Sequence, residues 1–464
     1  MSLISTLRGW FRMFFDGKAK EEFDVKPIPK TQTNSFIEEC QNIYAGVPAW
    51  ANGDIKTINF AKSVCSEIAR LTMQGTTITI DGSGRADELQ KRIDENYTEI
   101  RRWVEYGCAS GMVICKPNGE SIDIALPGEF IITEVDGPKI RGCVFLNTQY
   151  ADERYYHRLE YHHFEDNGKY AISNRTYASK SENAIGDPVD IDASPWAGML
   201  EDVESDNIDR MLFGVLKMPN ANNIDPSSPY GLPIFADAVQ ELEDLDVAYS
   251  RNSKEIFDSK RTVLLDSDRL IPSGTKLGSA SYDDRREAAG LPDYVKIVEG
   301  MGDKDIYHEI NPTLNTDARL VGLNNLLSQI GYKCGFSNGY FVFNQKSGMV
   351  TATQVESEDR RTLQLVKDIR DQLEKCLDDL IYALDKFLDN DGFPVGKYEV
   401  TYDFGDLTYN REEDRARWWG YVISGAVPKW YYFNKFEGLS EEDAKKLVEE
   451  AEPKEQILPN LEEE

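Results

Sequence analysis

Hydrophobic positions in the second half of the chain recur every three or four residues over long stretches, which is the period of an amphipathic helix. Three such stretches follow one another, at about 233–258, 316–334 and 353–391. The last keeps the period for roughly 35 residues, which at 1.5 Å per residue predicts a rod of roughly 50 Å. Helices in compact domains average about 11–12 residues, so this length suggests an element that spans an assembly.

The first half of the chain alternates between helical and strand patterns. Helical spacing over Ile58–Leu71 precedes a β-rich run at Thr76–Ile80, and a second helix is expected from about Ala86 to Tyr106. Strand pairs follow, separated by dipeptides that favour the positive φ of tight hairpin turns, at Asn118-Gly119, Asp136-Gly137 and Asn167-Gly168. A helix pair followed by an antiparallel meander predicts an α+β fold.

Shorter elements complete the pattern. β-like runs at 262–265 and 294–298 lie between the first two long helices, and a strand is expected over Tyr398–Phe404. A helix is expected over about 411–423, and Ser440-Glu-Glu-Asp443 has the form of a capping box that opens a last helix.

Residues 182–209 hold nine acidic residues and no Lys or Arg. Asp187, Asp190 and Asp192 hint at a calcium loop, but Pro188 follows the first acid and Gly198 stands where the bidentate Glu belongs. A solvated loop is the interpretation we carry forward.

The net charge of −29 works against tight binding of nucleic acid, because affinity for DNA comes from basic residues that neutralise phosphates. Two interpretations remain. The acid keeps the chain soluble, or it holds passing DNA at a distance.

The seven cysteines are scattered and include no CxxC pair, so neither a zinc ribbon nor a redox dithiol is predicted. Buried free thiols are the expectation. They are Cys40, Cys65, Cys108, Cys115, Cys143, Cys334 and Cys376.

Residues 1–24 form an amphipathic arm in which Arg8 and Arg12 interrupt apolar side chains. The apolar run is far short of the roughly 20 residues of a membrane span. Such a helix either lies on a membrane surface or docks on a neighbouring protein, and we expect the second.

Motifs that carry chemistry do not emerge. Gly82-Ser-Gly84 resembles part of a dinucleotide loop, but Asp87 occupies the place of the third glycine, and no GxxxxGK[ST] loop occurs. His157 and His163 share one face of an expected strand without a further ligand cluster. The sequence therefore predicts no cofactor, no metal and no catalytic residue, although a carboxylate pair among so many acids stays open.

The order of elements from Pro229 onward resembles the portal, or head-to-tail connector, proteins of tailed bacteriophages. Met349–Glu356 is similar to the family's TAT-x-V-E entry into a long helix, and 337–348 is similar to its tunnel loop. Val422–Val427 and Gly438–Ala444 resemble its C-terminal region. The resemblance covers most of the chain, from about Tyr44 to Glu452.

The resemblance implies an architecture and its boundaries. These are an arm (1–24), an α+β wing (25–228), a first stem helix (229–258), a small α/β clip (259–312), a second stem helix (313–336), a tunnel loop (337–352), a long helix (353–391), a wing strand (392–410) and a helical crown with an acidic tail (411–464).

The resemblance also implies a function without catalysis. Twelve copies would form a ring at one capsid vertex of the virion, nucleate assembly with the major capsid and scaffolding proteins, and dock the packaging ATPase (terminase) through 259–312. Head-completion adaptor proteins would bind there later, with duplex DNA passing through the channel and no membrane involved.

Two sets of residues would face this DNA. The tunnel loop would present Tyr340, Asn344, Gln345, Lys346 and Ser347, and the acidic channel lining would hold Glu241, Glu243, Asp244 and Asp246. For the acids, a solvated helix face is the alternative. For the loop, the alternative is that Tyr340, Phe341 and Phe343 pack into the wing. A minor capsid or baseplate protein and a carboxylate-based hydrolase remain as other functions.

Overall fold

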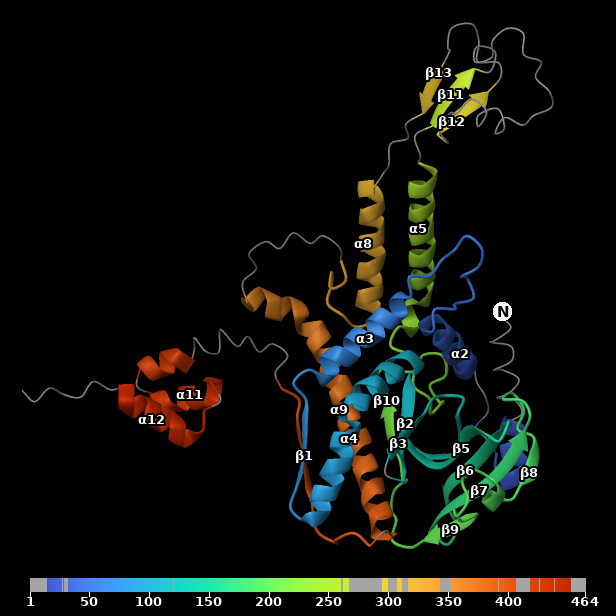
Figure 1. Cartoon of the computed structure of the whole chain (residues 1–464), viewed down its shortest axis with the longest axis vertical. Coiled ribbons are helices and arrows are strands. Elements are labelled where there is room, and N and C mark those ends of the chain that lie inside the picture. The colour runs from blue at the N-terminus through green and yellow to red at the C-terminus, as the bar shows by residue number, and fades with distance from the viewer. Residues whose placement is uncertain are drawn as a thin grey trace, which may run out of the picture. The chain divides into compact units, whose positions relative to one another are not determined.

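Helices and strands both build the molecule, so that the chain is α+β, as the sequence predicted. The computed structural model describes residues 15–26, 28, 32–119, 121–259, 262–266, 294–298, 307–310, 316–342, 352–390, 392–405, 418–424, 426–437 and 439–451 (Figure 1). The chain divides into two compact units, Met1–Phe404 and Gly405–Glu464.

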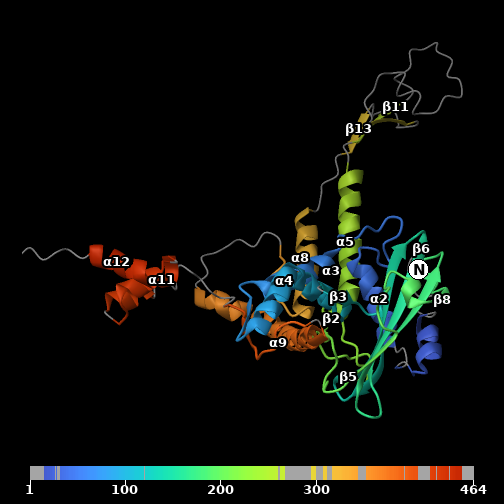
Figure 2. The ribbon, with the colours of Figure 1, turned by 60° about the horizontal axis from the view of Figure 1, so that its bottom comes forward.

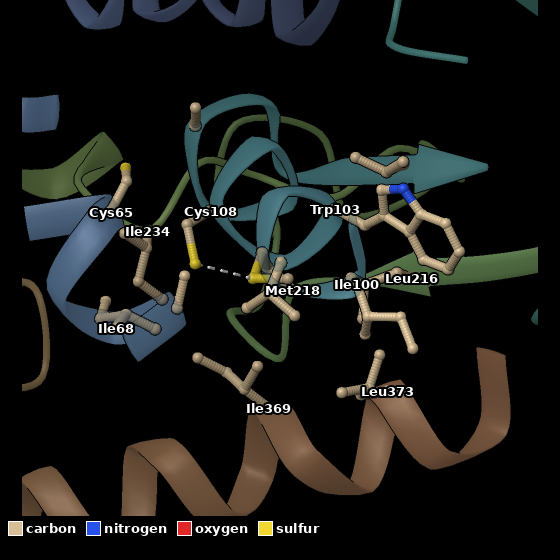
Figure 3. Close-up of a cluster of buried hydrophobic side chains, with 14 of the residues drawn as sticks. Cys65, Ile68, Ile100, Trp103, Cys108, Leu216, Met218, Ile234, Ile369 and Leu373 are labelled. Carbon is tan, nitrogen blue, oxygen red and sulfur yellow. Dashed lines mark hydrogen bonds between the residues drawn. The ribbon is translucent and has the colours of Figure 1, made fainter. Parts of the chain in front are cut away.

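The core of the first unit is built on the longest helix, α9 (Ala352–Asn390), which packs on α3 (Phe60–Met73) and α4 (Gly84–Ser110). At about 1.5 Å per residue its 39 residues span roughly 58 Å. Figure 3 shows the buried side chains where the three helices meet. They include Cys65 and Ile68 of α3, Ile100, Trp103 and Cys108 of α4, and Ile369 and Leu373 of α9.

Two buried arginines fix α9 against the other helices. The Arg85 side chain of α4 forms ion pairs with Asp389 at 2.5 Å and Asp385 at 3.4 Å, near the end of α9. Arg370 of α9 donates hydrogen bonds to the carbonyl oxygens of Leu71, Thr72 and Gln74, at 3.2, 2.9 and 2.8 Å. Because the last carbonyls of a helix lack intrahelical partners, this guanidinium caps the C-terminus of α3.

The strands among the described residues form four sheets. The hairpin at Asn118-Gly119 joins β2 (Met112–Asn118) to β3 (Ser121–Ala125), and β10 (Gly214–Lys217) pairs with the other edge of β2. A larger antiparallel sheet has the order β4-β5-β6-β7-β8. Its strands are β4 (Phe130–Asp136), β5 (Lys139–Ala151), β6 (Arg154–Phe164), β7 (Tyr170–Ser179) and β8 (Asp187–Val189).

All three predicted hairpins are confirmed. A fourth, between β5 and β6, turns at Asp152 and Glu153, with φ of 47° and 60°. The sequence prediction missed it because neither residue is the glycine that positive φ usually selects.

The solvated loop predicted for 182–209 is wrong in part. β8 and β9 (Asp202–Ser205) both pair with β7, and a 3-10 helix, η1 (Ile191–Ala193), lies between them. Ile185, Ile191 and Trp196 are buried, so apolar anchors hold this acidic stretch against the sheet.

The N-terminal arm also differs from its prediction where the structure describes it. Residues 15–23 are helical, and Phe15 and Ala19 are buried in one cluster with Leu159 and Tyr161 of the large sheet. The described part of the arm therefore covers a sheet of its own chain instead of a neighbouring protein. Phe23 is partly buried against the same cluster, whereas Leu3, Ile4, Leu7, Trp10, Phe11 and Phe14 lie outside the described residues.

A long helical hairpin follows β10. It consists of the 3-10 helix η2 (Ala236–Ala238), α5 (Val239–Asp258) and α8 (Thr316–Lys333). The predicted helix from 233 begins later, because the buried Ile234, Phe235 and Ala238 fix that turn in the core. Between the two helices the chain forms a separate sheet in the order β12-β11-β13. Its strands are β11 (Thr262–Asp266), β12 (Val295–Val298) and β13 (Tyr307–Ile310), of which β13 was not predicted.

The predicted strand after α9 is present as β14 (Glu399–Asp403). It pairs antiparallel with β1 (Thr77–Asp81), which lies far away in the sequence. Another helix, α2 (Gln32–Tyr44), packs on α3 and α4.

The second unit is described over a helix at 418–423, α11 (Lys429–Glu437) and α12 (Glu441–Ala451). Ser440 caps the start of α12, as predicted, since the Asp443 backbone N–H donates to Ser440 Oγ at 3.1 Å. The Asp443 carboxylate accepts from the Ser440 hydroxyl at 2.7 Å. Helix α11 was not predicted. Aromatic rings dominate the contacts of this unit, among them Trp418 stacked on Tyr431 with ring centroids 5.4 Å apart.

Candidate assembly and channel surface

Helices α5 and α8 lie side by side and run antiparallel (Figure 1 and Figure 2). Ion pairs fix their register near both ends. Lys333 Nζ lies 2.6 Å from Glu241 Oε1, and Arg319 is ion-paired with Glu255. Glu241 and Glu255 are as many residues apart as Arg319 and Lys333, so the two helices keep one register along their length.

The structure places Asp246 inside the molecule, which corrects its assignment to the channel lining. Its side chain is 4% exposed and accepts hydrogen bonds from the indole N–H of Trp50 at 2.9 Å and from the Ile58 backbone N–H at 3.0 Å. One turn further along α5, Ser250 Oγ accepts from the Lys56 backbone N–H at 2.8 Å. Asp246 and Ser250 together bind the 50–58 segment to the side of α5.

The other three acids also separate. The Glu241 carboxylate is ion-paired with Lys333 between the two helices, so its assignment to the channel lining is corrected as well. Glu243 and Asp244 are exposed, as a channel lining requires. Arg251 and Lys254 are exposed further along the same helix. An acid in the first turn of α5 complements the helix dipole, whereas no base lies in its last turn. Exposure of Glu243 and Asp244 alone therefore does not select the channel function.

Of the five residues assigned to the tunnel loop, the structure describes only Tyr340. Its hydroxyl hydrogen-bonds the Glu67 carboxylate of α3, and its ring lies 4.9 Å from Phe336 and 5.0 Å from Phe341. Burial and the Glu67 carboxylate raise the pKa of Tyr340 to about 12. Tyr340 lies in a turn, but its contact with Glu67 anchors it to α3, which corrects its assignment as a DNA-facing residue of the tunnel loop. Asn344, Gln345, Lys346 and Ser347 lie outside the described residues.

A second contact holds the start of the segment that leads from α8 to α9. The Ser337 backbone N–H donates to Thr362 Oγ1 at 2.9 Å, and the two hydroxyls are 3.1 Å apart. Both residues are buried. Ser337 follows α8 and Thr362 belongs to α9, so the chain that leaves α8 returns to the same point within α9.

Sequence reasoning missed a buried charged cluster between the large sheet and β2. Glu160 of β6 lies at its centre and accepts from Lys116 of β2, Arg158, His162 and the side-chain amide of Asn147. Its distances to Arg158, His162 and Asn147 are 2.9, 2.9 and 3.0 Å. The nearby cations hold the pKa of Glu160 well below its usual range, although burial works against them. The cluster ties two sheets together.

The hydrogen bonds around His162 are consistent with a neutral ring. Nε2 lies 2.9 Å from Glu160, and Nδ1 lies 2.7 Å from the Tyr170 hydroxyl, whose oxygen already accepts from the Leu212 backbone N–H at 3.1 Å. A neutral ring that donates from Nε2 and accepts at Nδ1 satisfies all of these groups. Burial lowers the pKa of His162 further. The alternation of Arg158, Glu160 and His162 was the available signal, but it resembles a solvated strand face.

A shallow groove of about 580 Å³ runs beside β1 and α4. Gln90 crosses it, since its amide accepts from the Ile80 backbone N–H at 2.7 Å and donates to the Ile78 carbonyl at 3.1 Å. This side chain pairs with the free edge of β1 as a neighbouring strand would. Thr77 and Thr79 also line the groove, and its charged residues are the acids Asp81, Asp87, Asp94 and Glu95 with one cation, Lys91. Like charge here opposes phosphate binding, in agreement with the rejected dinucleotide loop.

Among the described residues, no three His, Cys, Asp or Glu side chains lie close enough together to hold a metal ion. The seven cysteines are free and buried, as predicted. Among the helices that the structure describes, none is long and apolar enough to cross a membrane.

Comparisons with known proteins add no relative. No protein-family model matches the sequence, and a search of curated proteins returns no match.

Proposed function

We infer that this chain is a portal-type subunit, copies of which form a ring at one capsid vertex of a tailed bacteriophage. Duplex DNA would pass through the ring during packaging and ejection, and the chain itself would catalyse nothing. The observation that supports this most is the helical hairpin of α5 and α8, which encloses the separate β12-β11-β13 sheet in sequence and precedes the 39-residue α9. That is the element order of stem, clip, stem and long helix.

The charge supports a channel that DNA crosses without being held. The net charge is −29, and the exposed Glu243 and Asp244 remain available on α5 after Glu241 and Asp246 are assigned to internal contacts. Acidic walls repel phosphates, whereas basic walls would bind them with high affinity. The channel assignment now rests on two acids of α5 in place of four.

Residues 259–312 would form the end of the ring that docks terminase and later the adaptor proteins. They form a separate module in sequence, and their three strands pair only with one another among the described strands. Replacing 259–312 with a short linker should leave the α3–α4–α9 core folded and abolish terminase binding. Retained binding would show that docking lies elsewhere.

Negative-stain electron microscopy of the purified chain tests the proposed function. Closed rings with a central channel, no nucleotide turnover and weak binding to free duplex DNA at physiological salt are expected. Closed particles without a channel would instead favour another structural protein of the virion. Turnover in a screen of nucleotides and glycans, lost on acid-to-amide substitution, would favour the carboxylate-based hydrolase.

A further inference from the structure

The outer face of α8 carries almost no charge of its own in a chain of which 29% is charged. At one end of this face the Arg361 guanidinium of α9 lies over the Tyr332 ring, 3.8 Å from its centroid. Between Asp317 and Lys333 the only charged residue is Arg319, which is ion-paired with Glu255 of α5. The exposed residues of this stretch form one helical stripe: Ala318, Val321, Gly322, Asn325, Gln329 and Tyr332. Depletion of charge marks the centre of protein–protein interfaces and not a solvated face.

Gly322 leaves room for a partner on this stripe. Glycine is among the least favourable residues inside a helix, and a Cβ added at Gly322 would meet nothing within 4 Å. The chain's own packing therefore does not require a glycine at this position. Gly331 of the same helix differs, because a Cβ there would meet the Phe341 ring at 3.2 Å. The space beside Gly322 is therefore open to a close approach from outside the chain.

Helix α5 carries the complementary feature on the opposite side of the pair. Tyr249 and Ile256 are 42% and 54% exposed, although both are large and apolar. With about 100° per residue, and with the ion-paired residues marking the contact line between the helices, Tyr249 and Ile256 lie on one side of the pair. The exposed stripe of α8 lies on the other side.

The ion-paired register also sets the heights of these residues. Tyr249 is as far from Glu241 as Asn325 is from Lys333, so the two residues lie level. By the same register Ile256 is level with Ala318, and Gly322 lies between these two heights. Rotation about an axis parallel to the helices preserves height. Tyr249 and Ile256 of one copy would therefore straddle Gly322 of the next.

We propose that the outer face of α8 around Gly322 binds the Tyr249–Ile256 side of α5 from a second copy of this chain. The contact is heterologous, because it joins two different sides of the helix pair, and repetition around an axis closes a ring. The proposal rests on the proposed ring and names the surface that forms it. It requires no ligand and no further protein.

Cysteine cross-linking tests the contact directly, because all seven native cysteines are buried and burial raises the pKa of thiols such as Cys65 and Cys108. The variant carrying both Tyr249→Cys and Asn325→Cys is treated with a short bismaleimide and separated on a denaturing gel. A ladder of covalent multimers is expected from the double variant and none from either single variant. A single variant that stops at a covalent dimer would indicate an isologous contact and overturn the proposal.

Gly322→Ala provides the second test, with Gly17→Ala as its matched control. Gly17 is also helical and exposed, and a Cβ added there would meet nothing within 4 Å. Gly322→Ala should leave the melting temperature of the dissociated chain unchanged or higher, and should raise the concentration needed for assembly about tenfold, as expected for overpacking a close contact. Gly17→Ala should not change assembly. Unchanged assembly of Gly322→Ala would contradict the proposal.

The proposed interface and the proposed portal-type function can be rejected independently of each other. Closed rings in which the double-cysteine variant gives no ladder would exclude this interface and leave the ring-forming function standing. A ladder from open filaments, with no closed ring, would retain the interface and reject the portal-type function.

Discussion

Helices α4 and α8 of the first unit differ sharply in how much of themselves they bury. Of the 27 residues of α4 twelve are buried, because α2, α3, α9 and the strands around them cover it on several sides. Of the 18 residues of α8 three are buried, and its main packing partner is α5. The body around α4 completes its own core, whereas the α5–α8 pair leaves one uncharged face of α8 and three large apolar side chains of α5 exposed.

The largest expected effect lies in the body, at its buried charge. Glu160→Gln would leave Lys116 and Arg158 buried without their counter-ion, and removing one partner of a buried ion pair costs about 3–5 kcal/mol. The free energy of unfolding from denaturant titration should fall by that amount. Glu204→Gln, which breaks only the exposed pair with Lys169, is the control and should cost less than about 1 kcal/mol. Equal losses of unfolding free energy in the two variants would show that the contact between β2 and the large sheet does not depend on Glu160.

A pair of apolar truncations compares the two regions directly. Leu380→Ala in α9 removes a side chain that is 0% exposed and should cost about 2–5 kcal/mol of folding stability. Val321→Ala in α8 removes one that is 60% exposed and should change the stability of the dissociated chain by less than about 0.5 kcal/mol. Val321→Ala should instead weaken assembly. A large loss of monomer stability from Val321→Ala would mean that α8 is packed within its own chain.

The body should also respond to acid. The folded-state pKa of His162 is lowered, so the unfolded chain binds a proton below the ordinary pKa of about 6.5 while the folded chain does not. Stability should therefore fall as pH drops through 6.5. The lowered pKa of Glu160 adds a further loss below the usual carboxyl range. Denaturation midpoints measured between pH 7.5 and 5 should decline, and a flat profile would contradict a neutral, buried His162.

The smallest effect is expected where the chain passes from α8 towards α9. Tyr340→Phe removes the hydrogen bond to Glu67 but keeps the ring contacts with Phe336 and Phe341. A half-exposed hydrogen bond contributes about 0.5–1.5 kcal/mol. Limited proteolysis of the 337–342 connection should accelerate modestly, with Ser424→Ala, which removes an exposed side-chain bond elsewhere, as control. An unchanged cleavage rate would show that Tyr340 is not an anchor.

Local signals in the sequence predicted most of the elements. The helical period predicted α3, α8 and α9 to within a few residues and the end of α5 but not its start, and the Asn-Gly and Asp-Gly turns predicted the three hairpins. Both signals depend on neighbouring residues alone. Short elements without such signals, β13 and α11, were missed for the same reason.

The placement of single acids could not be predicted. Asp246 and Glu243 belong to one acidic run of α5, yet Asp246 is buried by Trp50, which lies 196 residues away in sequence. Glu160 is likewise buried by Lys116 of a different sheet. Burial of a charge depends on which distant element covers it, and helical or strand periodicity carries no such information. The exposure of α8 follows the same logic, because its expected cover is a second copy.

Hydrogen exchange measured by mass spectrometry, above and below the concentration at which the purified chain assembles, tests most directly whether another copy completes the α5–α8 pair. Peptides from 318–332 of α8 and from 249–256 of α5 should gain protection on assembly. Peptides from α4 and α9 should be equally protected in both states. If the α8 peptides are already as protected in the dilute chain, or gain no protection on assembly, the pair does not form the contact between copies.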